Sequence, residues 1–196
     1  MNKSIIINQI KAIVIYEFLN NFNKLEICIR NIFEKNLDKI SKKDLNKLYF
    51  LYGGKIGTYI NMEEEAIQLT KLQYKDEEVF KEFTIIQLLK LNKELNFIEK
   101  FKFEIQSLKN KNVVFEFYDS AIQLVNMRNI LAHNTSELNF KQKHYIEILS
   151  DETINNNLSD NMNGYDASSM DEITKQIYSN NIYLKKILEI LNDEME

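Results

Sequence analysis

The segment F-N-K-L-E-I-C-I-R-N-I-F-E-K-N-L, residues 22–37, carries the clearest structural pattern in this chain. Its apolar side chains recur three or four residues apart, a spacing that places them on one face of an α-helix. The members of this stripe are Phe22, Leu25, Ile29, Ile32, Phe33 and Leu37. The pattern therefore predicts a helix with one buried face, on which Glu26 and Arg30 stand four residues apart and can pair across one turn.

The same helical spacing continues on both sides of this segment. Upstream, residues 4–20 carry an isoleucine-rich stripe, although its β-branched side chains also permit a short strand at 5–7. Downstream, Ser169 and Glu172 have the spacing of a capping box at the start of a last helix. The helices predicted downstream cover residues 41–52, 62–75, 76–110 with a break near 92–96, 113–132, a short piece at 141–150, and 169–192.

The composition favours an all-α fold. The 196 residues include four glycines and no proline, which leaves little material for the tight turns of sandwiches and barrels. With 44% hydrophobic residues, the chain can bury a real core. We therefore predict a single all-helical domain over residues 1–196, with a flexible loop at about 151–168 before the C-terminal helix. The lone cysteine, Cys28, excludes an intramolecular disulfide framework and indicates a reducing cytoplasm.

The charge and the absent motifs exclude several functions. A net charge of −4 means that any contact with nucleic acid must be local. The sequence contains no P-loop, no HExxH motif and no cysteine–histidine metal cluster, so neither a metal nor a cofactor is expected. No uncharged apolar run approaches 18 residues, so no membrane span is expected either.

One short motif stands out, N-M-R-N-I-L-A-H-N at residues 126–134. It places Arg128, one of only two arginines, five positions before His133, one of only two histidines. Residues five apart on an ideal helix point about 140° away from each other. We therefore expect the two side chains to converge only if the helix ends near Ala132, and the polar residue Asn134 favours such an end. In the alternative interpretation, Arg128 pairs with a carboxylate such as Glu26 and His133 caps the helix.

The residue types suit a phosphodiester substrate. An arginine fork can bind a phosphate and neutralise the charge that grows on its oxygens in the transition state. A histidine can take a proton from an attacking hydroxyl or give one to the leaving oxygen. In RNA the 2′-hydroxyl is an internal nucleophile. Arg128 and His133 are therefore candidate catalytic residues, with Asn129 beside them to orient the histidine or to bind phosphate.

The run Arg128-Asn129-x-x-x-His133 in a helical chain resembles the signature of the HEPN superfamily, in which a polar residue follows the arginine. Residues 25–32 also resemble an early helix of abortive-infection-type HEPN proteins. The resemblance implies a helical bundle with additional flanking helices. It assigns phosphate binding and transition-state stabilisation to Arg128, acid–base chemistry to His133 and a polar supporting position to Asn129. Glu26 becomes a helper that orients the cluster.

The resemblance also implies an activity and partners. HEPN domains usually form homodimers, and many are metal-independent endoribonucleases in phage defence, toxin–antitoxin or CRISPR-associated systems. We therefore expect an RNA substrate and a homodimer, with an antitoxin or a regulatory protein as a further partner. Lys141, Lys143 and His144 follow the motif and either line an RNA path or form a solvated basic face. The alternative function is a non-catalytic helical interaction or regulatory module of a defence system.

Overall fold

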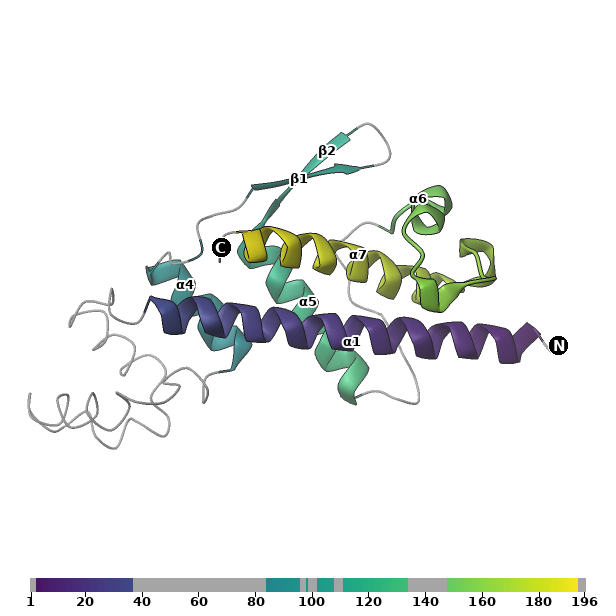
Figure 1. Cartoon of the computed structure of the whole chain (residues 1–196), viewed down its shortest axis with the longest axis horizontal. Helices are drawn as coiled ribbons and strands as arrows, with labels where there is room; N and C mark the ends of the chain where they lie inside the picture. Colours follow the sequence, from purple (N-terminus) through teal and green to yellow (C-terminus); the bar gives the residue numbers. More distant parts are fainter. Residues whose placement is uncertain are drawn as a thin grey trace, which may run out of the picture. The chain divides into compact units, whose positions relative to one another are not determined.

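The structure is a computed structural model that describes residues 3–36, 84–95, 98, 102–107, 111–133 and 148–193. These residues are mainly helical, which confirms the all-α fold class (Figure 1). The elements in chain order are α1 (Lys3–Lys35), α4 (Ile85–Leu95), β1 (Lys102–Ser107), β2 (Lys111–Glu116), α5 (Phe117–His133), α6 (Asp151–Asn156), the 3-10 helices η3 (Asp160–Met162) and η4 (Ala167–Ser169), and α7 (Glu172–Asp193).

The chain falls into two compact units. The first unit contains Met1–Cys28 and Lys100–Glu196, and the second contains Ile29–Glu99. Helix α1 is continuous from Lys3 to Lys35, so its first part belongs to the first unit and its last part to the second. Among the helices of the described ranges, none combines the length and hydrophobicity that a bilayer span requires.

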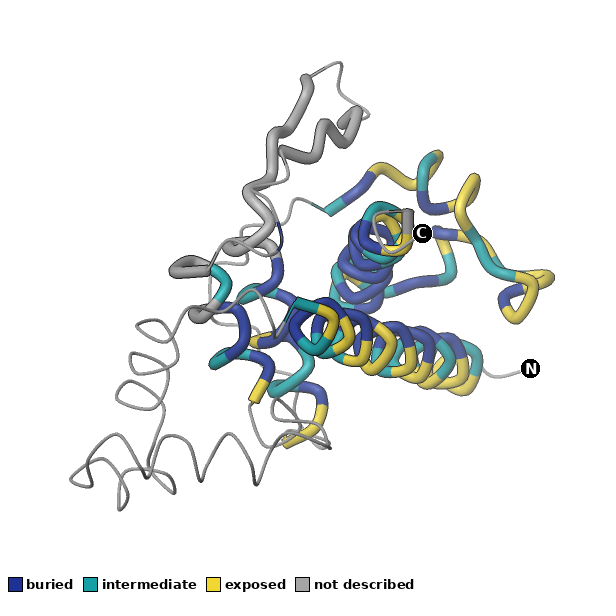
Figure 2. Tube along the Cα trace, turned by 60° about the vertical axis from the view of Figure 1, so that its left-hand side comes forward, coloured by how far each residue is buried: buried dark blue, intermediate teal, exposed yellow. Residues whose placement is uncertain are grey.

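Helix α1 joins the two predicted helices at 4–20 and 22–37 into one, and no strand forms at 5–7. Its buried side chains recur at helical spacing along one side, while the other side is exposed (Figure 2). An isoleucine costs at most about 0.7 kcal/mol of helix propensity. Burying a large apolar side chain such as Ile10 or Phe18 contributes roughly 1.5–3 kcal/mol. Tertiary burial therefore outweighs the weak local preference.

The core of the first unit is built from the apolar faces of three helices. Its fully buried side chains include Ile10, Val14, Phe18 and Leu25 on α1, Ala121 and Leu124 on α5, and Ile177, Leu184 and Leu191 on α7. Helices α1 and α7 lie side by side and run in the same direction (Figure 1). Three contacts fix this parallel arrangement, because the partners advance together along both helices: Lys11 with Asp171, Asn21 with Asn181, and Cys28 with Asn192.

A β-hairpin corrects two of the predicted helices. Strands β1 and β2 pair antiparallel, with Lys102 opposite Glu116 and Ser107 opposite Lys111. Residues 102–107 fall within the long helix predicted at 76–110, and the next helix is predicted to begin at residue 113, whereas α5 begins at Phe117. Both strand sequences, K-F-E-I-Q-S and K-N-V-V-F-E, are rich in the β-branched and aromatic residues that strands favour. Over six residues, a strand and a buried helical turn are hard to distinguish by periodicity.

The segment at 151–168, predicted as a loop, contains α6 and the two 3-10 helices. Ser150 caps α6, because its hydroxyl accepts a hydrogen bond from the Thr153 amide. Asn155 ties the segment together by accepting a 2.7 Å hydrogen bond from the Ala167 amide. Gly164 has a positive φ of 88°, a backbone conformation that glycine adopts without steric cost. The polar residues that led to the prediction of a loop at 151–168 therefore include residues that cap or connect short helices.

The predicted start of the last helix is wrong by a few residues. Asp171 caps α7, since its Oδ1 atom accepts a 2.7 Å hydrogen bond from the amide of Thr174. Ser169, the predicted cap, instead ends η4, where its amide donates to Asp166. The capping-box pattern rests on only two residues, and here Ser169 belongs to the 3-10 helix η4 and does not cap α7.

In the second unit, α4 replaces the middle of the predicted helix at 76–110. Thr84 and Gln87 form a capping box with reciprocal amide contacts of 2.8 and 3.3 Å. The helix ends at Leu95, inside the predicted break. The Asn92 side chain then bonds both the amide and the carbonyl of Ile98, at 2.7 and 2.9 Å. The predicted helices at 41–52 and 62–75 lie outside the described residues.

Candidate functional site

Helix α5 positions Arg128 and Asn129 next to each other. The Nη1 atom of Arg128 donates a 3.2 Å hydrogen bond to Oδ1 of Asn129, and both side chains are half-buried. The bond uses one of the five guanidinium N–H groups, and the planar fork as a whole has the geometry that binds an anion. The pair therefore combines a fixed positive charge with a neighbour that restricts its orientation.

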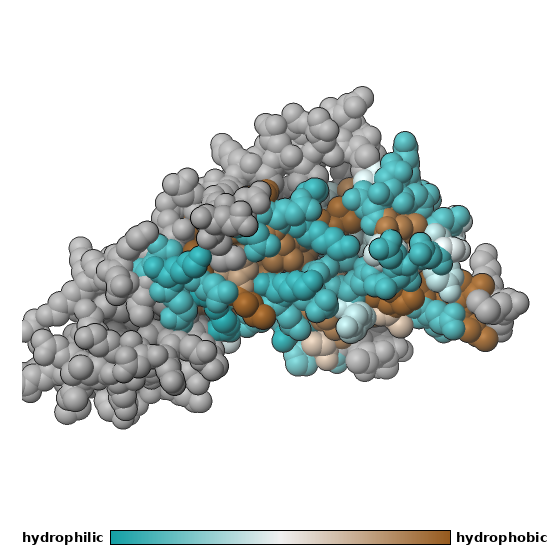
Figure 3. Space-filling view, in the orientation of Figure 1, coloured by the Kyte–Doolittle hydropathy of each residue, from teal (hydrophilic) through white to brown (hydrophobic). Residues whose placement is uncertain are grey.

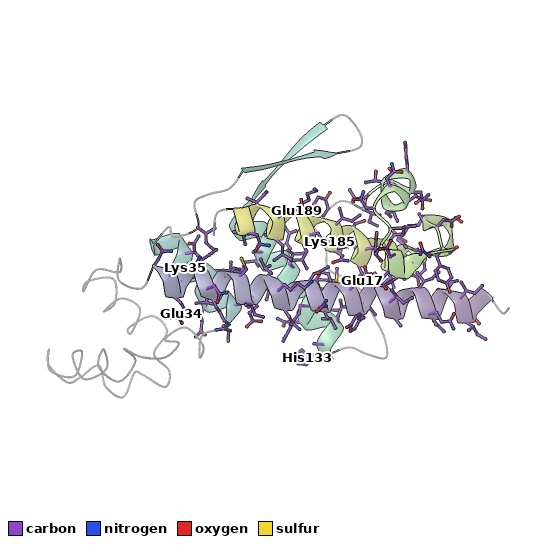
Figure 4. The ribbon with its side chains drawn as sticks, viewed as in Figure 1. Glu17, Glu34, Lys35, His133, Lys185 and Glu189 are labelled. Atoms are coloured by element: carbon purple, nitrogen blue, oxygen red, sulfur yellow. The ribbon has the colours of Figure 1, made fainter. Side chains whose placement is uncertain are left out.

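His133 is the last residue of α5, and its side chain is exposed (Figure 4). The helix ends one residue beyond Ala132, close to its predicted end, and His133 itself is still helical. On a continuous helix, residues five apart are about 7.5 Å apart along the axis and about 140° apart around it. The backbone of α5 therefore directs the Arg128 and His133 side chains towards different sides of the helix.

The structure places the other predicted site residues in different ways. Glu26 is a half-buried residue of α1 in the first unit, the unit that also contains α5. Lys141, Lys143 and His144 lie outside the described residues. The described part of the candidate site is therefore the α5 cluster, which we define as Arg128, Asn129 and His133.

The electrostatics of α5 restrict where an anion can bind. The C-terminal end of a helix carries partial negative charge from its unpaired carbonyl groups, which disfavours an anion beside His133. Arg128 is more than one turn earlier and carries a full charge in a fork geometry. Any phosphate held by the α5 cluster must therefore be attracted by Arg128. The exposed imidazole of His133 remains available for proton transfer.

A second polar cluster, which the sequence analysis missed, lies between α1 and α7. We call it the α1–α7 polar seam and define it as Glu17, Asn21, Tyr178 and Asn181, which are all buried. Asn21 donates a 2.9 Å hydrogen bond to Asn181. Figure 4 shows Glu17 on the side of α1 that faces α7.

Glu17 also fastens the segment before α7 to α1. Its Oε1 atom accepts hydrogen bonds from the Ser159 hydroxyl at 2.5 Å and from the Asn161 amide at 3.2 Å. Tyr178 donates a short hydrogen bond to the carbonyl oxygen of Asn157. Burial, reinforced by the negative charge of Glu17, raises the pKa of Tyr178 to about 12. The phenol therefore stays protonated and keeps its donor role over the physiological pH range.

Parts of the seam are left unpaired. Among the described residues, Oε2 of Glu17 and Nδ2 of Asn181 are buried without a hydrogen-bond partner, as is the hydroxyl of Thr174 on α7, outside the seam. Such atoms are costly, at about 1–3 kcal/mol each. The seam therefore reduces stability relative to an apolar interface, and what it provides is a defined alignment of α1 with α7.

A run of polar residues in α7 is the sequence feature that indicates this seam. The run Ser179-Asn180-Asn181 interrupts the apolar pattern in the middle of α7, and all three side chains are buried. Polar residues within a helix are ordinarily assigned to the solvated face. Three consecutive polar residues of a helix point in directions about 100° apart, so they cannot all lie on the solvated face. Such a run therefore indicates a buried polar contact.

The chain matches no family model, no curated protein and no solved structure. Within the described ranges, no three His, Cys, Asp or Glu side chains gather closely enough to hold a metal ion.

Proposed function

We propose that this protein is a metal-independent endoribonuclease of the HEPN type, which cleaves single-stranded or loop RNA. The observation that carries the proposal is the arrangement of α5, where an arginine held by Asn129 precedes an exposed histidine at the helix end. The resemblance of Arg128-Asn129-x-x-x-His133 to the HEPN signature supports the same activity. The proposal includes a cytoplasmic location and a role in phage defence, a toxin–antitoxin pair or a CRISPR-associated system.

In the proposed reaction, the RNA 2′-oxygen attacks the adjacent phosphorus while a base removes its proton. The bond from phosphorus to the 5′-oxygen breaks, and that oxygen receives a proton. The products are a 2′,3′-cyclic phosphate and a 5′-hydroxyl. Arg128 stabilises the charge on the non-bridging oxygens, and His133 transfers a proton.

The divergence of Arg128 and His133 on one helix favours a site shared by two chains. A second copy can supply the histidine that a single α5 directs away from its own arginine. The proposal therefore includes a homodimer in which the α5 clusters of both copies meet. An antitoxin or regulatory protein that covers these clusters would restrain the activity.

The test is cleavage of a mixed-sequence RNA in excess EDTA by the wild type, His133→Ala and Arg128→Ala. Loss of a catalytic proton-transfer group lowers the rate by about 10²–10⁴-fold. Asn126→Ala is the matched control, because Asn126 is exposed on the same helix and lies outside the α5 cluster. EDTA-resistant cleavage that both site variants lose and the control retains supports the proposal. Equal cleavage by all four proteins contradicts it.

The same divergence favours a second function, a non-catalytic helical interaction module. In that case Arg128 and Asn129 form part of a surface that binds another molecule, and His133 transfers no proton. The module predicts no RNA cleavage at any protein concentration, and a loss of folding stability in Arg128→Ala and His133→Ala. Circular dichroism and a cleavage assay on the same samples separate the two functions.

A further inference from the structure

The turn between η3 and η4 contains Asn163-Gly164, the one asparagine–glycine step in the sequence. Asn163 has a φ of −53° and a ψ of 125°, and Gly164 has a φ of 88°. The Tyr165 amide donates a 3.0 Å hydrogen bond to the carbonyl of Met162. These values define a type II turn with glycine at its third position. Asn163 and Gly164 are both exposed, and the surface over α6 and the segment that follows it is mainly hydrophilic (Figure 3).

An asparagine side chain can react with the main-chain nitrogen of the next residue. In this step the nitrogen of Gly164 attacks Cγ of Asn163, and a new N–C bond forms. The side-chain nitrogen leaves as ammonia and takes the Gly164 amide proton with it, which leaves a five-membered succinimide ring. Water then adds to either ring carbonyl and breaks its bond to nitrogen, which gives aspartate or isoaspartate. Water is the only other reactant.

The turn leaves the two reacting groups free to meet. Within the described part of the chain, neither the Gly164 amide nor the Asn163 side chain makes a hydrogen bond. The space where a Cβ atom of Gly164 would stand is open, with no atom within 4 Å. Ring closure needs a rotation about the Cα–C bond of Asn163, and the glycine permits it at low steric cost.

The four other asparagines between residues 151 and 169 are held in place. Side-chain hydrogen bonds engage Asn155, Asn157 and Asn161. The main-chain nitrogen after Asn156 donates to carbonyl groups of α6 and is not free to attack. None of the four precedes a glycine, so a side chain also shields each target nitrogen. The reaction is therefore directed to Asn163.

We propose that Asn163 is a self-modification site, which converts to aspartate and isoaspartate through a succinimide, and that this conversion loosens residues 157–169 from α1 and α6. Isoaspartate inserts an extra carbon into the main chain of the turn. Either product adds a negative charge three residues from both Asp160 and Asp166. This site does not depend on the proposed ribonuclease activity.

The position of the turn explains the loosening. It lies between two attachments, the 3.2 Å hydrogen bond of Asn161 to Glu17 on α1 and the 2.7 Å hydrogen bond of the Ala167 amide to Asn155 on α6. A longer main chain changes the separation of these two points, and like-charge repulsion opposes the compact turn. Both effects act against the attachments.

The first test follows the Asn163 amide in the full chain during several weeks at neutral pH. Trypsin cleavage after Lys143 and Lys175 releases one peptide that also contains the four other asparagines, so fragment masses compare them directly. Asn163 should lose its amide first, at a rate within about tenfold of that in the urea-denatured chain, because exposed turns open at almost no free-energy cost. An amide that survives in the folded protein overturns the proposal, as does equally fast loss at Asn155 or Asn156.

The second test measures amide hydrogen exchange in fresh protein and in the aged form, which its added negative charge separates by anion exchange. The amides of Ala167 and Ser169, bonded at 2.7 and 3.1 Å, should lose protection in the aged form. Asn163→Gln, aged in the same way, should keep this protection, because a glutamine would have to close a larger ring. Equal protection in fresh and aged wild type, or equal loss in Asn163→Gln, overturns the loosening of residues 157–169.

Discussion

The Nδ2 atom of Asn21 donates a 2.9 Å hydrogen bond to Oδ1 of Asn181, between two buried side chains that are 160 residues apart in the sequence. The bond joins the first helix of the chain to the last. Sliding one helix along the other would leave both amides unpaired among apolar side chains. The pair therefore selects one alignment of α1 with α7 out of several that hydrophobic contact alone would allow.

Replacing one member of this pair is expected to destabilise the protein. Asn21→Leu and Asn181→Leu should each lower the free energy of unfolding by about 1–3 kcal/mol, because the remaining amide stays buried without its partner. The double variant should lose less than the sum of the two losses. Urea unfolding measures all three. Asn126→Leu at an exposed position of α5 is the control, and strictly additive losses would show that the two side chains are not coupled.

Tyr178 should make stability depend on alkaline pH. Its pKa is raised from 10.0 to about 12, so the folded protein retains a proton that the unfolded chain releases. Stability from this group is complete below about pH 10 and is lost as the pH rises towards 12. Unfolding measured from pH 9 to 12 should show this loss in the wild type. The corresponding slope should be smaller in Tyr178→Phe, and equal slopes would contradict the assignment.

Asp171 should stabilise α7 through two separate interactions. It caps the helix at Thr174, and its Oδ2 atom lies 3.6 Å from Nζ of Lys11. Asp171→Ala should cost about 0.5–2 kcal/mol, whereas Asp171→Asn keeps a good capping side chain and should cost less. Thermal unfolding measures both. If the two variants lose the same stability, the cap contributes little and the charge is responsible.

Acidic pH provides an independent check on Asp171. Burial raises the pKa of this carboxyl, but hydrogen bonds from Thr174 and the charge of Lys11 outweigh burial, and the pKa falls below 3.8. A lowered pKa contributes stability above the unfolded value, and this contribution disappears as the pH falls through the folded value. The wild type should therefore lose more stability than Asp171→Asn between pH 5 and about pH 2.

Asn129 should affect RNA cleavage through Arg128. Removing the arginine should lower kcat by about 10²–10³-fold, the usual effect of losing a transition-state donor. Asn129→Ala removes only the 3.2 Å contact that orients the guanidinium, and should lower kcat by roughly tenfold. Asn129→Asp keeps an acceptor at this position and should recover part of the rate. A larger loss for Asn129→Ala than for Arg128→Ala would assign Asn129 a direct role instead.

Local patterns in the sequence determined much of the fold. The three- and four-residue spacing of apolar side chains predicted the helical segments that form α1 and α7. The all-α class predicted from this spacing is confirmed by the structure. The break predicted near 92–96 matches the end of α4 at Leu95. These features depend on residues within one or two helical turns of each other, so they can be predicted from the sequence of the segment alone. The motif at Arg128 and His133 was also visible there, while its activity stays a prediction.

Tertiary structure decided the features that depend on distant partners. Residues 102–107 and 111–116 pair as strands, although the sequence analysis placed 102–107 and 113–116 in helices. Asp171, not Ser169, caps α7, because η4 engages the serine first. The buried hydrogen bond of Asn21 with Asn181 joins two segments from opposite ends of the chain. Its contribution to stability depends on both partners being buried together, which no local sequence pattern indicates.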